Sequence, residues 1–523
     1  MNSNSIHYKS PSVFNTKPLY LAVLMAVNTI SAFAETTADT LPEVKVQAEQ
    51  PRNDYNEPVS TVGGKMPTAV RDIPQSVTIL NRAVLDAKAD TSLADALRNV
   101  PGITIGGAEG GQIGTNINLR GFSARTDMYV DGMRDRGQYY RDTFYLSAVE
   151  VLKGPSSMLF GRGSTGGVVN QVRKKPVLGD SGEVSATMGT NGYYRTTGDY
   201  NKQLTDTAAT RVEVMGQNVG STRDVMDNED YAIAPSLRLG IGTDTQINFS
   251  ALVERNHDQP DYGIPTVNGK PAKVNYDNYY GLTDDRTNQN TNIFGVSIQH
   301  KFNDNLTFRN QTQYANYETD ARETAFGRLG TVNGLGQFVW LGATPAATGN
   351  YTNLSSSSLF ATLASHDRKI DDNSFDNQTD LIAKFNTESL KHTMIVGLEL
   401  GHDEYSNQTY SRSNSALTGT SGSLTSSTVA LVSLNNPTYF STPVGTVTTT
   451  GNLAKSTADT LATYVNDTIE FNPQWKAVLG LRWDRFQASI NNSINSTNTV
   501  GNTTLANAGC VKFMAGSAYG ARY

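Results

Sequence analysis

The stretch Gly161-Arg-Gly-Ser-Thr-Gly166 matches the G-x-G-x-x-G pattern of a dinucleotide-binding turn. Such a turn needs a helix that opens directly from it, because the helix N-terminus holds the pyrophosphate. Residues 168–173, Val-Val-Asn-Gln-Val-Arg, are instead β-branched and alternating, so they predict a strand. The stretch also lacks the lysine of a phosphate loop, and Arg162 breaks the G-x-S-x-G pattern of a hydrolase. We therefore expect no cofactor, and a tight turn in which glycine permits close backbone approach.

No second motif in the chain supports catalysis or metal binding. The single cysteine, Cys510, excludes an intrachain disulfide and a thiolate cluster. The six histidines are scattered, without an H-E-x-x-H pair. We therefore expect neither an enzyme nor a protein-bound metal. The net charge of −6 gives no reason to expect nucleic-acid binding, which favours a basic surface.

Residues 1–34 have the parts of a secretory signal peptide. Lys9 and Lys17 precede a mostly apolar run from Leu19 to Val27, and Ala32-Phe-Ala34 offers a small-residue cleavage site. The run is too short to span a bilayer comfortably, and no later stretch has about 18 uninterrupted apolar residues. The sequence therefore predicts an exported protein without a transmembrane helix.

A polar linker at 35–66 leads into residues 67–178, which predict a compact α+β domain. Its helix begins after Thr91 or Ser92, either of which can cap it, and Pro101-Gly102 ends it. Short strands are predicted at 75–80, 116–120, 128–130 and 149–152.

Residues 183–523 have a different sequence pattern, in which apolar and polar residues alternate over long segments. The segments 246–254, 391–402 and 475–483 each place apolar residues on one face, with Leu252 as an exception. Strands of roughly ten residues with one apolar face are what a transmembrane antiparallel β-barrel requires.

The connections between these strands alternate in length. Short ones lie at 204–207, 242–244, 303–305 and 472–474, and long ones rich in Gly, Asn, Ser and Tyr lie at about 257–292, 320–372 and 404–458. Outer-membrane barrels have short periplasmic turns and long outer loops. A soluble β-sandwich would show shorter strands and no such asymmetry.

A series of motifs runs through residues 71–170. In chain order these are Arg71-Asp-Ile-Pro-Gln-Ser-Val77, Asp95-Ala-Leu-Arg-Asn-Val-Pro-Gly102, Asn118-Leu-Arg-Gly-Phe122, Val130-Asp-Gly-Met-Arg-Asp135, Val149-Glu-Val-Leu-Lys-Gly-Pro-Ser156 and Gly161 through Asn170. The series resembles the plug of the TonB-dependent outer-membrane receptors, most closely the catecholate siderophore receptors of the Fiu and PiuA type. Asp261-Tyr-Gly-Ile-Pro265 also resembles that subgroup. The resemblance implies a barrel of about 22 strands around an N-terminal α+β plug, with about half of those strands present here.

The resemblance further implies uptake of a ferric siderophore across the outer membrane of a Gram-negative bacterium, energised by TonB. It gives the role of TonB box, which pairs with TonB by strand addition, to Leu41, Pro42, Glu43, Val44, Lys45 and Val46. From its residues alone this segment is an ordinary linker. Ferric siderophore and outer-membrane lipid are the other expected partners, and the siderophore itself holds the iron.

The resemblance also places residues 131–145 in a plug loop at the extracellular apex, next to a second loop at 110–113. A ferric tris-catecholate is strongly anionic and has aromatic faces, so cations and aromatic rings suit it. The expected ligand-binding residues are Gln112, Arg134, Arg136, Tyr139, Tyr140, Arg141 and Tyr262. In the alternative, some arginines pair with neighbouring aspartates or contact the barrel wall, and we expect about half of the set to be structural. Arg120 and Glu150 are expected in charge pairs at the plug–barrel boundary.

Two further readings stay open. The ligand could be haem, cobalamin or a glycan, or the chain could be a truncated receptor that does not transport. Residues 508–523 lack clean alternation and include Cys510, so they do not predict a final barrel strand. We therefore expect a fragment or the product of a premature stop.

Overall fold

The computed structural model describes residues 55–108, 111–267, 269–334, 337–340, 356–414, 428–442, 447–494, 499–505 and 510–519. The chain divides into two units, Met1–Asn53 and Asp54–Tyr523. The predicted signal peptide and the predicted TonB box therefore lie outside the described residues. In the described ranges no helix is long and apolar enough to cross a membrane.

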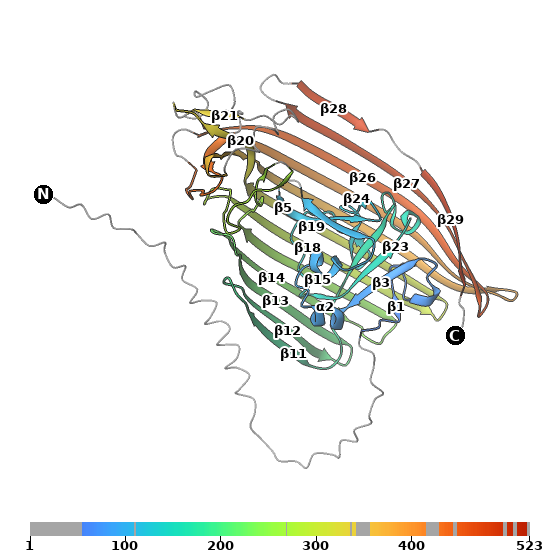
Figure 1. Ribbon diagram of the computed structural model, residues 1–523. Helices are drawn as coiled ribbons and strands as arrows, with labels where there is room; N and C mark the ends of the chain where they lie inside the picture. The colour runs from blue at the N-terminus through green and yellow to red at the C-terminus, as the bar shows by residue number, and fades with distance from the viewer. Residues whose placement is uncertain are drawn as a thin grey trace, which may run out of the picture. The chain divides into compact units, whose positions relative to one another are not determined.

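The first part of the second unit is the predicted α+β plug (Figure 1, blue to cyan). Its central sheet has the order β3-β9-β10-β7-β8, with β7 parallel to β10 and the other pairs antiparallel. These strands span Ser76–Asn81 (β3), Leu146–Lys153 (β9), Gly167–Arg173 (β10), Met128–Val130 (β7) and Met133–Arg134 (β8). A second sheet joins Ile103–Ala108 (β4), Gly111–Leu119 (β5) and Phe122–Ser123 (β6).

Short helices complete the plug. They span Arg82–Lys88 (α2), Leu93–Leu97 (α3) and Ser157–Phe160 (α4), with a 3-10 turn at Val70–Asp72 (η2). The Oγ of Ser92 accepts from the Asp95 backbone N–H, so one of the two predicted capping residues is confirmed. Val59–Ser60 (β1) pairs with Thr68–Ala69 (β2), and we call residues 59–69 the strap.

Most of the remaining described residues form one antiparallel sheet of 13 strands. Its strands are Ser181–Met188 (β11), Tyr194–Thr205 (β12), Ala208–Gly220 (β13), Asp227–Leu239 (β14), Thr245–Asp258 (β15), Arg286–Asn303 (β18), Leu306–Arg322 (β19), Asp367–Thr387 (β23), Leu390–Asn414 (β24), Val447–Asn472 (β26), Trp475–Ile494 (β27), Thr499–Leu505 (β28) and Cys510–Tyr519 (β29). The expectation that residues 508–523 form no barrel strand was wrong, because Cys510–Tyr519 (β29) pairs with β27. Backbone pairing with a neighbouring strand does not require apolar alternation.

The two faces of this sheet differ as the alternation predicted. Phe249, Val396, Leu398, Leu400 and Leu481 are exposed on the outer face. The inner face packs against the plug, and the largest apolar cluster joins both. From the plug it includes Leu85, Leu93, Leu97 and Val149, and from the sheet Met215, Leu252, Ile293, Ala315 and Tyr317. Leu252 broke the sequence alternation because it points inward, into this shared core, where it is 1% exposed.

The four short connections are turns, as predicted, but the long connections are not plain loops. They carry Thr266–Val267 (β16), Lys270–Pro271 (β17), Thr324–Val332 (β20), Phe338–Trp340 (β21), Phe360–Ser365 (β22) and Thr428–Ser433 (β25), with a 3-10 turn at Ser356–Ser358 (η4). Four of these form a separate sheet, β21-β20-β22-β25, with its own apolar core around Leu363, Val429 and Leu434. The predicted loop boundaries were therefore too wide. The long strands continue past the apolar band with polar residues, which leave no alternating apolar signal.

Candidate functional site

The glycine-rich turn returns the plug chain from α4 onto β10. β10 then runs antiparallel to β9, so the predicted strand after the glycines is confirmed. A Cβ on Gly166 or Gly167 would collide with the backbone carbonyl oxygen of Leu119 or Leu152. A Cβ on Gly161 would lie 2.7 Å from an Nη atom of Arg482 in β27. The glycines thus serve close packing inside the plug and against the sheet.

Three of the predicted ligand-binding residues lie buried in contacts of the plug with itself and the sheet. Arg134 donates to the carbonyl oxygens of Thr126, Phe160 and Arg162. Arg141 Nε lies 2.8 Å from Asp135 Oδ2, and the hydroxyl of Tyr139 donates to the same oxygen at 3.1 Å. The Tyr139 ring stacks on Tyr317 of β19 at 5.5 Å. These contacts favour a structural role, and ligand binding by the three residues stays a prediction.

Arg136 and Tyr140 contact the inner wall of the sheet. Arg136 forms ion pairs with Asp376 of β23 at 2.8 Å and with Asp403 of β24 at 2.6 Å. The backbone N–H of Tyr140 donates to Gln289 Oε1 of β18 at 3.1 Å. The backbone of Gln112 lies in β5, and its side chain is outside the described part. Their roles toward a ligand likewise stay predictions.

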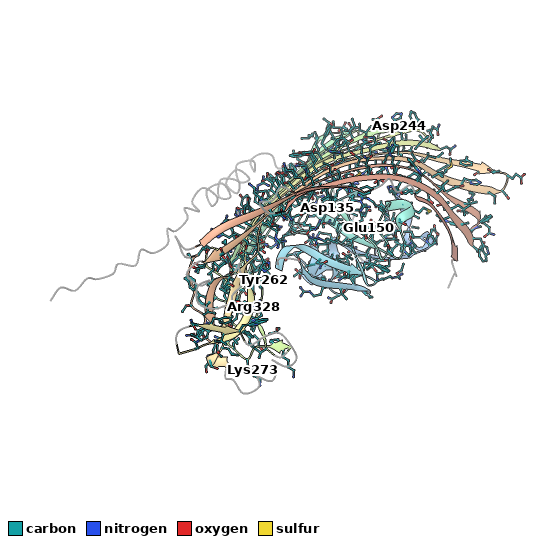
Figure 2. The ribbon with its side chains drawn as sticks, turned by 90° about the horizontal axis from the view of Figure 1, so that it is seen from above. Asp135, Glu150, Asp244, Tyr262, Lys273 and Arg328 are labelled. Atoms are coloured by element: carbon teal, nitrogen blue, oxygen red, sulfur yellow. The ribbon has the colours of Figure 1, made fainter. Side chains whose placement is uncertain are left out.

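Tyr262 lies apart from this plug segment, among the long connections. Figure 2 shows it on the side of Arg328 and Lys273, away from Glu150. Its hydroxyl donates to Glu323 Oε2 at 2.6 Å, and burial raises the pKa of that carboxyl to about 7. The structure therefore brings Arg134 to Arg141 together on one segment and places Tyr262 in a second group.

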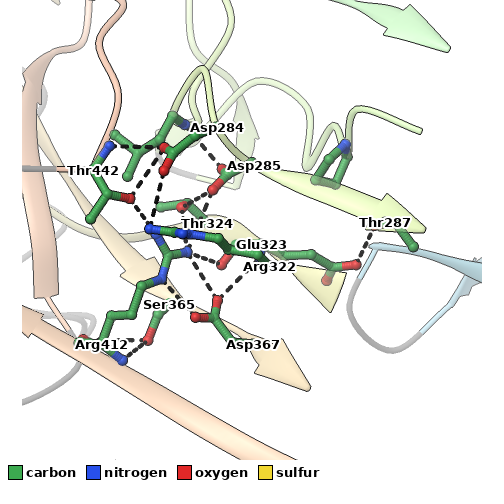
Figure 3. A network of polar contacts seen from close by, with 12 residues as sticks. Asp284, Asp285, Thr287, Arg322, Glu323, Thr324, Ser365, Asp367, Arg412 and Thr442 are labelled. Carbon is green, nitrogen blue, oxygen red and sulfur yellow. Dashed lines mark hydrogen bonds and ion pairs between the residues drawn. The ribbon is translucent and has the colours of Figure 1, made fainter. Parts of the chain in front are cut away.

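Arg412 is the centre of the second group (Figure 3). Its guanidinium lies 2.7 Å from Asp367 Oδ2, and it also donates to Thr324 Oγ1 at 3.1 Å and Thr442 Oγ1 at 2.9 Å. Asp285 accepts from the same guanidinium at 3.4 Å, and burial raises the pKa of this carboxyl to about 6. One buried cation thus fastens three long connections to one another.

Two cations that the sequence reasoning missed stand out on the plug. Arg162 lies 3.3 Å from the ring centroid of Phe486 in β27, and burial with Arg134 and Arg136 nearby lowers its pKa to about 10. Arg125 is exposed and donates to Gln138. Within the described residues neither arginine has an ion-pair partner. A lone arginine in a glycine-rich turn gave no sequence signal, because only the fold brings Phe486 beside it.

Glu150 does not form the expected charge pair at the plug–barrel boundary. It accepts from the hydroxyls of Ser60 and Thr61 at 2.8 and 3.2 Å and from the Asn170 amide at 2.8 Å, all within the plug and its strap. Arg120 is exposed and lies beside Gly154 of the plug. The expectation for Glu150 was wrong because neutral donors of the strap and of Asn170 satisfy the buried carboxylate, and that for Arg120 was wrong because it forms no ion pair with the described residues.

Lys65 of the strap makes the contact with the sheet instead. Its Nζ donates to Gln378 Oε1 at 2.7 Å and lies 3.9 Å from Glu399 Oε2. Glu399 in turn lies 2.9 Å from Arg482. Burial lowers the pKa of Lys65 to about 8. The strap is therefore fastened to the plug by Glu150 and to the sheet by Lys65.

A cavity of about 210 Å³ lies between the strap, the plug sheet and the inner wall. Its lining includes Lys65, Asp131, Arg238, Arg309 and Gln311. In the described ranges no three His, Cys, Asp or Glu side chains are grouped so that they could hold a metal ion.

The chain matches two family descriptions. Residues 69–168 match the TonB-dependent Receptor Plug Domain, and residues 230–511 match the TonB dependent receptor-like β-barrel. The chain is 31% identical over 522 residues to the "Probable TonB-dependent siderophore receptor PiuA" of Acinetobacter baumannii, covering 95% of this chain and 65% of the relative. It is 29% identical over 495 residues to the "Catecholate siderophore receptor Fiu" of Escherichia coli K12, covering 91% of this chain and 60% of the relative.

Solved structures give the same result. The crystal structure of the siderophore receptor PiuA from Acinetobacter baumannii superposes with a TM-score of 0.74 at 29% identity, over 86% of this chain and 63% of that one. The closed form of the ferric-catecholate import receptor Fiu from Escherichia coli K12 gives 0.71 at 25% identity, over 89% and 65%. The chain spans less than two thirds of the length of these relatives. With its plug and its antiparallel barrel strands, the chain belongs to the TonB-dependent receptor family.

Proposed function

We propose that the chain acts in the uptake of ferric siderophores, of the catecholate type, across the outer membrane of a Gram-negative bacterium. The observation that carries this proposal is the similarity to PiuA and Fiu, which extends through both the plug and the barrel strands. Both relatives are described as siderophore receptors, and Fiu as a catecholate receptor.

Cationic and aromatic groups on the plug support an anionic, aromatic ligand. Arg162 carries a positive charge over the Phe486 ring without an ion-pair partner in the described residues. Arg125 is exposed and likewise has no ion-pair partner in the described residues. A guanidinium can both stack on a catechol ring and attract its negative charge. We therefore add Arg125 and Arg162 to the seven binding residues predicted from the sequence.

TonB is the proposed energising partner. Leu41–Val46 would add as a strand to TonB in the periplasm, as the resemblance implies. The strap begins 13 residues after Val46, so a pull on that segment reaches the strap before the central plug sheet. Release of the contacts to Glu150 and Lys65 would then open the cavity that the strap helps to line.

Competition binding tests the ligand class. Cells that display the chain are incubated with a radiolabelled ferric tris-catecholate and an excess of haem, cobalamin, a soluble glycan or unlabelled complex. Only the unlabelled ferric catecholate is expected to displace the label. Displacement by haem, cobalamin or the glycan would assign the chain to another large ligand, and the absence of any specific binding would support a receptor that does not transport.

A further inference from the structure

A chain of buried hydrogen bonds crosses the seam between the plug and strands β12 to β15. It begins with plug residue Asp142, which pairs with both terminal nitrogens of Arg195 at 2.8 Å. Arg195 donates to Gln217 Oε1 at 2.5 Å, and Gln217 donates to Asp230 Oδ2 at 2.7 Å. This series of hydrogen bonds continues to β15, where Asn256 and Glu254 are the next residues.

Asn256 connects the last two carboxylates. Its amide nitrogen donates to Asp230 Oδ1 at 2.9 Å and to Glu254 Oε1 at 3.3 Å. Asp230 is 4% exposed, and Glu254 and Asn256 are fully buried. The chain of contacts therefore ends at two buried carboxylates that receive only neutral amide donors.

These two carboxylates are not balanced by a protein cation. Within the described residues neither Asp230 nor Glu254 forms an ion pair. The guanidinium groups of Arg141 and Arg195 form ion pairs with other carboxylates. Arg141 pairs with Asp135 and Arg195 with Asp142, each at 2.8 Å. An isolated buried carboxylate is strongly unfavourable unless a proton or a cation neutralises it. When both carboxyls are ionised, the seam carries two negative charges that no ion pair of the described residues balances.

The same place holds three buried oxygen atoms without a hydrogen-bond partner. They are Glu254 Oε2, Asn256 Oδ1 and Thr291 Oγ1, and all three residues are fully buried. Glu254 and Asn256 are two apart in β15 and so share its inner face. Thr291 of β18 is the direct cross-strand partner of Glu254. What sets these three oxygens apart is that they gather on neighbouring side chains of β15 and β18, beside Asp230, and this grouping points to a bound group.

We propose that Glu254, Asn256 and Thr291, with Asp230 beside them, bind one Ca²⁺ ion at the plug–barrel seam. Carboxylate, amide and hydroxyl oxygens are the ligands that a hard divalent cation prefers, and Ca²⁺ accepts such mixed sets in irregular geometry. A charge of +2 matches the two unpaired carboxylates. Only two of these ligands are acidic, which is why the residues form no group of three His, Cys, Asp or Glu side chains. The ion would join β14, β15 and β18 directly beneath plug residues 138–145.

Calcium binding by the purified 523-residue chain in detergent tests the proposal. The protein is stripped with a chelator and dialysed against ⁴⁵Ca²⁺, and thermal unfolding is followed with and without the ion. The variants are Glu254→Gln, which removes a charge, and Thr291→Val, which removes one oxygen and keeps the shape. Glu229→Gln is the matched control, because Glu229 is exposed on the outer face one residue from Asp230.

The expected result is one Ca²⁺ per chain for the native protein and for Glu229→Gln. Glu254→Gln should weaken binding at least tenfold, and Thr291→Val should weaken it about threefold. Calcium should raise the unfolding midpoint by about 5 °C only where it binds. The proposal is overturned if the native chain binds no calcium. In that case protonated carboxylates or a bridging water would satisfy the buried oxygens. It is also overturned if both variants bind calcium as tightly as the control. If Glu254→Gln does not fold, the calcium affinity of Thr291→Val alone tests the proposal.

Discussion

The plug meets the sheet at two seams that are built in opposite ways. Along β23 to β27 four buried or half-buried carboxylates each pair with an arginine: Arg136 pairs with Asp376 and Asp403, and Arg482 with Glu399 and Asp484. Along β12 to β15 one such pair, Arg195 with Asp142, is followed by two carboxylates without a cation. The first seam is held by ion pairs of the protein, and the second would be completed by the proposed Ca²⁺ ion.

This difference bears on the proposed transport, in which the plug would have to rearrange. A buried ion pair costs about 3–5 kcal/mol when one partner is removed, whereas removing an unbalanced charge costs little or is favourable. The two seams should therefore respond with opposite signs to the loss of a charge. The strap, which follows the predicted TonB box in the sequence, belongs to the first seam through Lys65.

The largest effect is expected from Arg482→Met. It leaves Asp484 buried without a cation and Glu399 with only the 3.9 Å contact to Lys65, so the free energy of unfolding should fall by about 3–5 kcal/mol. Denaturant unfolding of the chain in detergent measures this. Arg485→Met, at an exposed neighbouring position, is the control. An equal small effect of both changes would contradict the balanced seam.

Lys65 should make the first seam sensitive to alkaline pH. Its pKa is lowered to about 8 in the folded chain from an ordinary value near 10.5, so the unfolded chain binds the proton more tightly. Stability should therefore rise as the pH increases from 8 to 10.5, by about 3 kcal/mol relative to Lys65→Met. Unfolding midpoints of both proteins across this range give the answer. Lys384→Met, which changes an exposed lysine, should keep the native profile, and parallel curves for the native chain and Lys65→Met would refute the prediction.

Glu150→Gln should loosen the strap without unfolding the plug. The amide cannot accept from Ser60, Thr61 and Asn170 together as the carboxylate does, and the expected local loss is about 1–3 kcal/mol. Hydrogen exchange of residues 59–69 should accelerate by at least tenfold, while β9 and β10 stay protected. Unchanged exchange in the strap would show that Glu150 does not hold it.

Arg162→Ala should weaken ligand binding more than it weakens the seam. A guanidinium against an aromatic face contributes about 1–2 kcal/mol when partly desolvated, so the loss of such a contact with a catechol ring should lower the affinity for a ferric tris-catecholate about tenfold. Arg98→Ala, at an exposed site on the plug, should leave affinity unchanged. If both variants bind alike, Arg162 is not a ligand contact.

The smallest effect, with the opposite sign, is expected from Glu254→Gln in calcium-free buffer. Removing an unbalanced charge should leave stability unchanged or raise it by up to about 1 kcal/mol, in contrast to Arg482→Met. The same unfolding experiment measures both variants. A loss comparable to that of Arg482→Met would remove the distinction between the seams.

The fold was predictable wherever the signal is local. Ser92 at the start of α3, the strand after the glycine turn, and the apolar outer faces of β15, β24 and β27 all follow from neighbouring residues. The small sheet in the long connections was missed, because its short strands lie among Gly, Ser and Asn residues. Its strands acquire a buried face only when three connections meet.

The site was less predictable because its contacts are distant in sequence. Arg136 and Asp376 are 240 residues apart, and no local pattern relates them. The arginines of the apex segment looked alike in the sequence, yet Arg141 is buried on Asp135 while Arg136 bridges two strands. Chemistry alone gives a residue type, and the fold decides whether its charge is free for a ligand.

Uptake of radiolabelled iron as a tris-catecholate complex tests whether the chain is a TonB-dependent siderophore transporter. The chain and a variant lacking residues 41–46 are expressed in a Gram-negative host without its own catecholate receptors, and surface binding and internalised iron are measured separately. A TonB-dependent receptor should bring iron into the cell, and the deletion should abolish uptake while binding is kept. Uptake that is unaffected by the deletion, or no uptake by the unaltered chain, would contradict the account.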